Sequence, residues 1–350
     1  MYSLNDLLIK VIDKGASDLH LSVGAYPALR IYGELVYIEE NVLTKEDIDK
    51  FVLEILGDNI CKYEDIGEID VAYSLKDIGR FRINIFKEKS RNAIAIRSIR
   101  KNILTLNDLS CPDIIKTLTN KKRGLILITG PTGTGKSTTV AAMIEEINRN
   151  KRLHIITLEE PIEYLYDNKK SIVNQREIGK DTNGYESALK SILRQDPDII
   201  VLGEMRDYAT IKLAITAAET GHLVISTLHT SSAAKTIDRI VDVFPSSQQN
   251  QIREQLALSL EAVITQELVL KKDRSGRIAV FEIMIATEGI RNLIRQGKIY
   301  QINSLIQTGS KYGMQTMDMA LMKLYEDDII SKSDLLIFLS NKDVIENMKS

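Results

Sequence analysis

Residues 124–139 read GLILITGPTGTGKSTT and indicate one architecture more strongly than any other stretch of the chain. The apolar run at its start predicts a buried strand. From Gly130 to Ser137 the residues fit the pattern G-x-x-x-x-G-K-S, and a helix is expected from Lys136 to about residue 150. A strand that leads through a glycine-rich loop into a helix is the context that this phosphate-binding motif requires. The stretch therefore predicts a nucleotide phosphate site.

The predicted loop offers both backbone and side-chain groups to the phosphates. Its glycines let backbone N–H groups turn inward around the β-phosphate, Lys136 supplies positive charge to the β- and γ-phosphate oxygens, and Ser137 offers its hydroxyl to Mg²⁺. The start of the helix adds the positive end of its dipole. Because the sequence carries no N-K-x-D signature for guanine, ATP with Mg²⁺ is the expected ligand. The predicted nucleotide-binding residues are Gly130, Pro131, Thr132, Gly133, Thr134, Gly135, Lys136, Ser137 and Thr138.

The pattern of strands changes near residue 110. After it, short apolar strands (153–158, 198–202, 222–227) alternate with helices, which predicts a mainly parallel sheet covered on both faces. Before it, strands with polar interruptions favour an antiparallel sheet. We therefore expect an α/β chain with an α+β domain at 1–105 and a P-loop domain at 106–350. From about residue 245 this second domain should be mostly helical, with a hairpin near Asp273–Gly276.

Bulk composition excludes several classes of protein. The 350 residues are 44% hydrophobic and 27% charged, which fits about two globular domains. The formal net charge of −2 gives no general attraction to nucleic acid, so no stable nucleic-acid binding is expected. No apolar run approaches the ~20 residues of a membrane-spanning helix. Cys61 and Cys111 are far apart, which disfavours a disulfide framework or a zinc site. A cytoplasmic location is expected, with attachment to a membrane only through a partner.

Two acidic segments follow predicted strands of the P-loop domain, where ligands of parallel sheets bind. In DIIVLGEM (198–205), the strand ends at Gly203 and Glu204, and Glu204 is expected to reach Mg²⁺ through water. In LEEPIEY (158–164), Glu163 is expected to act as the base that positions the attacking water. A solvated acidic surface is the alternative interpretation of each segment.

Two histidines lie at the ends of the strand expected at 222–227. His222 is at its amino end and His229 follows its carboxyl end, and their odd separation places them on opposite faces of an ideal strand, which disfavours a shared metal. His229 lies at the carboxyl end, where it could report the state of the γ-phosphate through a hydrogen bond. The alternative for each is an ordinary, satisfied buried histidine.

Four stretches together resemble the secretion ATPases of the type II and type IV pilus class. They match that family's boxes in order: GPTGTGKSTT the Walker A, ITLEEPIEYLY the aspartate box, DPDIIVLGEMRD the atypical Walker B, and TAAETGHLVISTLHTSSAAKTIDRIVDVFP the histidine box. Within the family the chain most resembles the pilus-retraction ATPases of twitching motility, on GASDLHLSVG, VNQREIG, FEIMIATEGIRNLI and TGSKYGMQTMDMAL. It departs from the family at Glu160, where aspartate is usual, and at Gly289, where the subfamily usually has alanine.

The resemblance implies a PAS-like N-terminal domain and a RecA-like ATPase domain, assembled as a homohexameric ring. It implies an ATPase motor that powers type IV pilus retraction, located peripherally at the inner face of the cytoplasmic membrane. Its partners would be an inner-membrane pilus platform protein and related pilus ATPases. It also implies that N-terminal arginines approach the phosphates, namely Arg82 and Arg97, with Arg80 a weaker candidate.

Other functions stay open at this point. A related motor could extend pili, drive secretion or move DNA in uptake, and an accessory ring could bind nucleotide with little hydrolysis. Extension-type relatives usually carry a longer N-terminal region and a four-cysteine zinc insert, and this sequence has neither. The balanced charge disfavours a DNA translocase. Lys136, Glu163 and Glu204 together favour an enzyme over an accessory ring.

Overall fold

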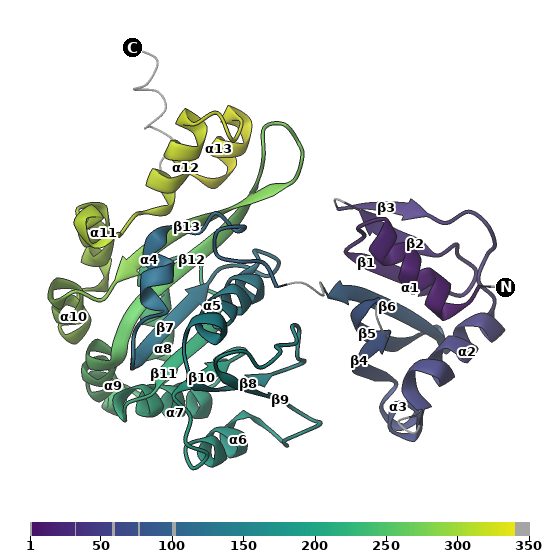
Figure 1. Cartoon of the computed structure of the whole chain (residues 1–350), viewed down its shortest axis with the longest axis horizontal. Helices are drawn as coiled ribbons and strands as arrows, with labels where there is room; N and C mark the ends of the chain where they lie inside the picture. The colour runs from purple at the N-terminus through teal and green to yellow at the C-terminus, as the bar shows by residue number, and fades with distance from the viewer. Residues whose placement is uncertain (1, 32, 58–59, 76–77, 100–102, 340–350) are drawn as a thin grey trace. The chain divides into compact units, whose positions relative to one another are not determined.

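The computed structural model describes residues 2–31, 33–57, 60–75, 78–99 and 103–339 (Figure 1). It divides into two compact units. The first comprises residues 1–102 with 161–165, and the second comprises residues 103–160 with 166–350. The domain boundary expected from the sequence, between residues 105 and 106, stays a prediction.

Within the described residues, the first unit is built on a six-stranded antiparallel sheet of order β3-β2-β1-β6-β5-β4. Its strands are β1 (Asp18–Ser22), β2 (Ala28–Ile31), β3 (Glu34–Tyr37), β4 (Glu68–Leu75), β5 (Gly79–Glu88) and β6 (Arg91–Ile99). Its helices are α1 (Leu4–Asp13), α2 (Lys45–Leu56) and α3 (Ile60–Ile66). The antiparallel sheet agrees with the pattern of polar interruptions in these strands.

Local sequence explains the start of helix α2 and the two faces of strand β1. Thr44 is the N-cap of α2: its hydroxyl accepts a hydrogen bond from the backbone N–H of Asp47, and the Asp47 carboxylate accepts one from the N–H of Thr44. This reciprocal pair satisfies two donors at the start of the helix. Leu19 and Leu21 of β1 are buried in the core of the unit, whereas the alternating residues Asp18 and His20 lie on the other face.

Within the described residues, the second unit holds a seven-stranded sheet of order β13-β12-β7-β11-β10-β8-β9. Its strands are β7 (Gly124–Thr129), β8 (His154–Glu159), β9 (Ile172–Glu177), β10 (Ile199–Leu202), β11 (Leu223–Leu228), β12 (Leu260–Leu270) and β13 (Arg277–Ile285). Neighbours from β12 across to β9 are parallel, and β13 is antiparallel to β12. Every residue of β7 is buried, as expected for a central strand covered on both faces.

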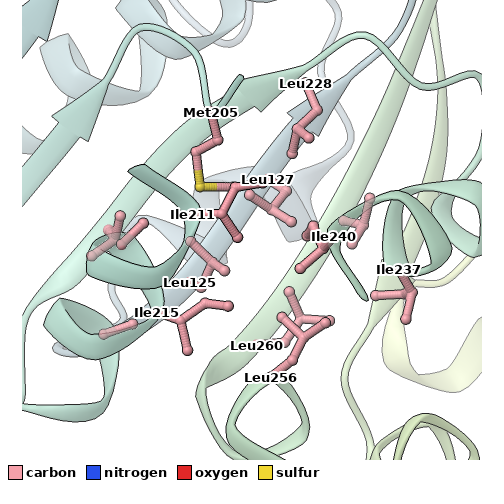
Figure 2. Packing of buried hydrophobic residues seen from close by; sticks show 14 of the residues in the cluster. Leu125, Leu127, Met205, Ile211, Ile215, Leu228, Ile237, Ile240, Leu256 and Leu260 are labelled. Atoms are coloured by element: carbon pink, nitrogen blue, oxygen red, sulfur yellow. The ribbon is translucent and has the colours of Figure 1, made fainter. Parts of the chain in front are cut away.

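Helices cover both faces of this sheet (Figure 1). The helices of this unit are α4 (Asp113–Leu118), α5 (Lys136–Asn150), α6 (Tyr185–Ile192), α7 (Tyr208–Glu219), α8 (Ala233–Asp242), α9 (Ser246–Ser259), α10 (Glu288–Arg295), α11 (Ile302–Gln307), α12 (Met317–Glu326) and α13 (Lys332–Phe338). Of these, α12 and α13 pack with β12 and β13 in a separate small core. Side chains of β7 alternate between two cores: Leu125 and Leu127 join one, and Ile126 and Ile128 join the other with residues of α4 and α5. Figure 2 shows the first core, where Leu127 lies among side chains that include Met205 and Ile211.

The α/β class predicted from the sequence is confirmed. The expected hairpin near Asp273–Gly276 is present, because β12 and β13 flank that turn. The mostly helical character of the region after residue 245 holds for α9 to α13, but β12 also extends the central sheet and pairs with β7. Sequence periodicity alone did not place this hairpin in the sheet. Among the described residues, none of the helices is long and apolar enough to span a bilayer.

Candidate active site

Three parallel strands bring the predicted site residues of the second unit to one edge. Leu228 of β11 pairs in register with Thr129 of β7, and Ser226 of β11 pairs with Leu202 of β10. The residues that follow these strands, the loop from Gly130, then His229, and then Gly203 with Glu204, therefore emerge next to one another. This is the carboxyl edge of the sheet, where α/β proteins bind their ligands.

Lys136 lies beneath the glycine-rich loop. Its ammonium group donates hydrogen bonds to the carbonyl oxygens of Gly130 (2.8 Å) and Pro131 (2.9 Å), and its side chain is buried. The Thr134 hydroxyl also donates to the Pro131 carbonyl, at 3.0 Å. These bonds fold the loop around one cation, while Gly133 at its tip has a positive φ of 84° and open space beside it. A loop with an exposed tip and a buried lysine fits the phosphates of a nucleotide.

His229 connects this lysine with Glu204. Nδ1 of His229 lies 3.5 Å from Nζ of Lys136, and Nε2 lies 3.3 Å from Oε1 of Glu204. A protonated lysine can only donate, so Nδ1 must accept, and in the neutral ring the proton then lies on Nε2, facing the carboxylate. The imidazole thus links the cation under the loop to the acid after β10.

Arg206 holds the other oxygen of the Glu204 carboxylate. Its Nε donates to Oε2 of Glu204 at 2.7 Å, and this contact raises the pKa of the guanidinium. Because His229 and Arg206 approach different oxygens, they fix the orientation of the carboxylate at the end of β10. Arg206 belongs to the segment DPDIIVLGEMRD, but its position there did not predict this contact.

Gly203 stands where the Walker B strand of many ATPases has an aspartate, and the structure gives a reason. A Cβ at this position would lie 3.2 Å from the Tyr185 hydroxyl and 3.3 Å from the Leu158 carbonyl oxygen. Thr227 also donates to the Gly203 carbonyl, at 2.5 Å, which ties β11 to this turn. Burial raises the pKa of Tyr185, and the nearby carboxylate of Glu160 raises it further. The neutral phenol therefore fills the space that an aspartate side chain would need.

The remaining predicted catalytic residues belong to the first unit. Arg82 on β5 pairs in register with Arg97 on β6, so the two side chains share one face of the sheet. Arg82 Nε lies 3.5 Å from Asp70 Oδ1, and Arg97 Nε lies 2.8 Å from Asp18 Oδ1. Glu163 lies in the loop 161–165, which clusters with the first unit although it follows β8 of the second.

Comparisons with known proteins fit this geometry. The family model for type II/IV secretion system proteins matches residues 65–274. The chain is 47% identical to the type IV pilus retraction ATPase PilT of Pseudomonas aeruginosa, over 95% of this chain and 96% of the relative. It is 46% identical to a twitching motility protein of Neisseria gonorrhoeae, over 87% of this chain and 82% of the relative. Among solved structures it matches one of the pilus retraction motor PilT with bound ADP, at a TM-score of 0.91 and 42% identity, covering 99% of this chain and 100% of the other.

The chain belongs to the type II/IV secretion system protein family. Its predicted resemblance to the pilus-retraction members of that family is confirmed by these relatives, and so is the predicted enzyme class, a nucleotide-binding ATPase. In this secretion ATPase the glycine-rich loop, His229 and Glu204 stand together in one unit.

Sequence reasoning missed a residue behind the loop of this secretion ATPase. Gln266 of β12 is buried, and its side-chain amide is hydrogen-bonded to both Thr134 and Thr139. Gln266 lies between Thr265 and Glu267 in β12, so the local sequence pattern gives no signal that its side chain is buried. The loop residues Pro131, Thr132 and Ser137 are exposed, and Thr138 is half-buried at the first turn of α5.

Proposed function

We propose that this chain is an ATP-hydrolysing motor that powers the retraction of type IV pili. The observation that carries the proposal is the linked set of Lys136, His229 and Glu204 at the carboxyl edge of the sheet, in a chain that aligns with nearly the full length of a retraction ATPase. ATP would bind with its phosphates over the loop from Gly130 to Thr138. The loop's N–H groups and Lys136 would then hold the β- and γ-phosphates.

The same edge offers oxygen ligands of the kind that Mg²⁺ prefers. Ser137 is exposed at the first turn of α5. Glu204 presents a carboxylate directly after β10, which is separated from β7 by β11. When bound, Mg²⁺ would neutralise charge on the β- and γ-phosphates. Ser137 would contact the ion directly, and Glu204 would hold one of its waters.

His229 would report whether the γ-phosphate is present. Its Nδ1 lies 3.5 Å from the Lys136 ammonium and 3.4 Å from the Thr132 hydroxyl. A γ-phosphate that draws the Lys136 ammonium toward itself would change this contact, and hydrolysis would restore it. A ligand shifts a conformational equilibrium only through such differential contacts. His229 would pass the difference to Glu204 through Nε2.

The first unit would complete the reaction. Glu163 would orient the attacking water, and Arg82 and Arg97 would stabilise charge developing on the γ-phosphate.

We assign residues 1–105 to a PAS-like domain and residues 106–350 to a RecA-like domain. Loss of the γ-phosphate would change how the two domains sit against each other. In a homohexamer this change would pull on an inner-membrane platform protein, so that pilins leave the base of the filament and it shortens. The motor would work peripherally at the inner face of the cytoplasmic membrane.

Deletion of the gene, followed by a count of surface pili, tests the retraction role. More and longer pili are expected, because assembly would continue without disassembly. Complementation with the wild-type gene should restore the original number, whereas the Glu204→Gln variant should not. Bald cells would instead indicate a motor for extension, and a purified wild-type protein that releases phosphate no faster than Glu204→Gln would indicate an accessory ring.

A further inference from the structure

The side chain of Gln266 links the glycine-rich loop to the helix that follows it. Its Nε2 donates to the Thr134 carbonyl oxygen at 2.7 Å, and its Oε1 accepts from the Thr139 hydroxyl at 2.7 Å. A carbonyl oxygen can only accept, so the NH₂ group must face Thr134, and this fixes the orientation of the amide. Gln266 is 2% exposed and Thr139 is fully buried, so water does not compete for these bonds.

The backbone of the loop also lies directly on the strand that carries Gln266. At Gly130, where φ is 140°, a Cβ would lie 2.3 Å from the carbonyl oxygen of Gln266. At Gly135, where φ is 86°, a Cβ would lie 3.0 Å from Gln266 Nε2. Two glycines of the motif are therefore needed for contact with β12 as well as for the phosphates. The neighbouring Thr129 hydroxyl donates to the Thr265 hydroxyl at 3.0 Å, which fixes the register of β7 and β12 at this point.

We propose that Gln266 is a positioning residue for ATP turnover. It does not face the phosphates; it holds the rear of the loop through Thr134 and the first turn of α5 through Thr139. These two segments flank Lys136 and Ser137. The amide therefore sets the distance between the loop and the first turn of α5, and both of these segments would bind the phosphates. Donors that are already aimed at their target need no reorganisation when charge develops there, which is why a support of this kind affects rate and affinity.

The proposal rests on the ATPase activity of the site and not on the coupling to pili. Gln266→Leu keeps much of the side-chain volume and removes both hydrogen bonds. Thr139→Val removes one of them without a change of shape, and Thr139→Ser keeps it. Gln315→Leu is the matched control, because Gln315 Nε2 also donates to a backbone carbonyl, that of Phe281 at 2.8 Å. Phe281 pairs in register with Gln266, so the control tests whether any lost hydrogen bond beside this strand pair has the same effect as loss of the contacts with Thr134 and Thr139.

The measurements are steady-state phosphate release against ATP concentration and calorimetric titration with ADP, on the purified full chain. Gln266→Leu is expected to lower kcat/KM by about 10- to 100-fold and to weaken ADP binding. Thr139→Val should move both quantities in the same direction, and Thr139→Ser and Gln315→Leu should match the wild type.

Wild-type kcat/KM and ADP affinity in Gln266→Leu and Thr139→Val would overturn the proposal. An equal loss in Gln315→Leu would also overturn it, because the effect would then be general destabilisation. If Gln266→Leu does not fold, the comparison of Thr139→Val with Thr139→Ser decides alone. A wild-type protein without phosphate release would instead contradict the proposed motor function.

Discussion

His229 Nε2 lies 3.3 Å from Oε1 of Glu204, and the two residues follow neighbouring parallel strands. The first prediction concerns the charge of that carboxylate. Glu204→Gln keeps the size of the side chain but removes the negative charge that would hold a metal-bound water. We expect kcat to fall by about 10²- to 10³-fold without a loss of ADP affinity. Phosphate release and ADP titration measure the two effects, and a rate near that of the wild type would contradict the assignment of Glu204.

The second prediction concerns the link itself. If His229 acts through Glu204, His229→Ala and Glu204→Ala should not be additive in kcat: the double variant should lose little more than Glu204→Ala alone. His222→Ala is the matched control. His222 lies at the other end of β11, where its Nδ1 is 3.0 Å from the Ala217 carbonyl oxygen, and its removal should leave kcat unchanged. Full additivity of the two losses would show that His229 and Glu204 act independently.

The third prediction tests why glycine stands at position 203. A Cβ there would lie 3.2 Å from the Tyr185 hydroxyl, so Gly203→Ala should force a local shift and destabilise the protein by roughly 1–3 kcal/mol. Tyr185→Phe removes that hydroxyl, and Gly203→Ala should therefore be less damaging in the Tyr185→Phe background. Thermal melting followed by circular dichroism gives the four stabilities. An equal cost in both backgrounds would mean that the Leu158 carbonyl, at 3.3 Å, is the decisive contact.

The sequence predicted the elements around the loop well, because each is constrained by several signals at once. The strand at 124–129 is apolar up to Thr129 and buried throughout, and the predicted helix start at Lys136 agrees with the structure. It did not predict β9, whose residues Ile172–Glu177 include Asn174, Gln175 and Arg176 and lie at the edge of the sheet. An edge strand with polar residues lacks the apolar run that pattern reading depends on.

The site was predictable only in part, for a related reason. Spacing after strands identified both Glu163 and Glu204 as candidate acids. The loop that carries Glu163 clusters with the first unit, whereas Glu204 belongs to the second, and spacing along the chain does not indicate this division. Gln266 lies 127 residues beyond Thr139 in the chain, and nothing local to either residue signals their hydrogen bond. Pairings of this kind are set by the register of β12 against β7, which the sequence pattern does not specify.

The fourth prediction separates catalytic from structural arginines in the first unit. Asp18 of β1 pairs in register with Arg30 on one side and Arg97 on the other, so the two arginines are matched neighbours. If Arg97 stabilises charge on the γ-phosphate, Arg97→Ala should lower kcat by on the order of 10³-fold. The stability of the Arg97→Ala variant should barely change. The Arg97 side chain is 64% exposed, and an ion pair of such a side chain, here with Asp18, contributes about 1 kcal/mol or less.

Arg30→Ala provides the control for that experiment. The Arg30 guanidinium donates to the Gly33 carbonyl at 2.9 Å, and we give it no part in turnover. Its kcat should match the wild type. Equal losses in the two variants would indicate that the charge of this sheet face matters as a whole. Wild-type rates in both would leave Arg82 as the main candidate and Arg80 as the weaker one.

The last prediction concerns Glu282, a buried carboxyl group on β13. Its Oε1 accepts from the backbone N–H of Ala233 at 2.7 Å, at the start of α8, a few residues after His229. Burial raises the pKa of this carboxyl, and nearby Asp318 raises it further, although hydrogen bonds from Ala233, Met317 and Thr265 oppose the shift. A folded-state pKa above the unfolded value means that the neutral form is favoured in the folded protein. The stability associated with that form is complete below the unfolded pKa and is lost as the pH rises through the folded pKa.

Glu282→Gln removes this titration and keeps an oxygen to accept from Ala233. The melting temperature of the variant should therefore rise relative to the wild type as the pH increases from about 4, near the unfolded value, to neutral and above. Glu288→Gln, at a side chain that is 87% exposed, serves as the control and should show no such trend. A difference between Glu282→Gln and the wild type that stays constant with pH would show that the carboxylate is fully compensated by its three donors.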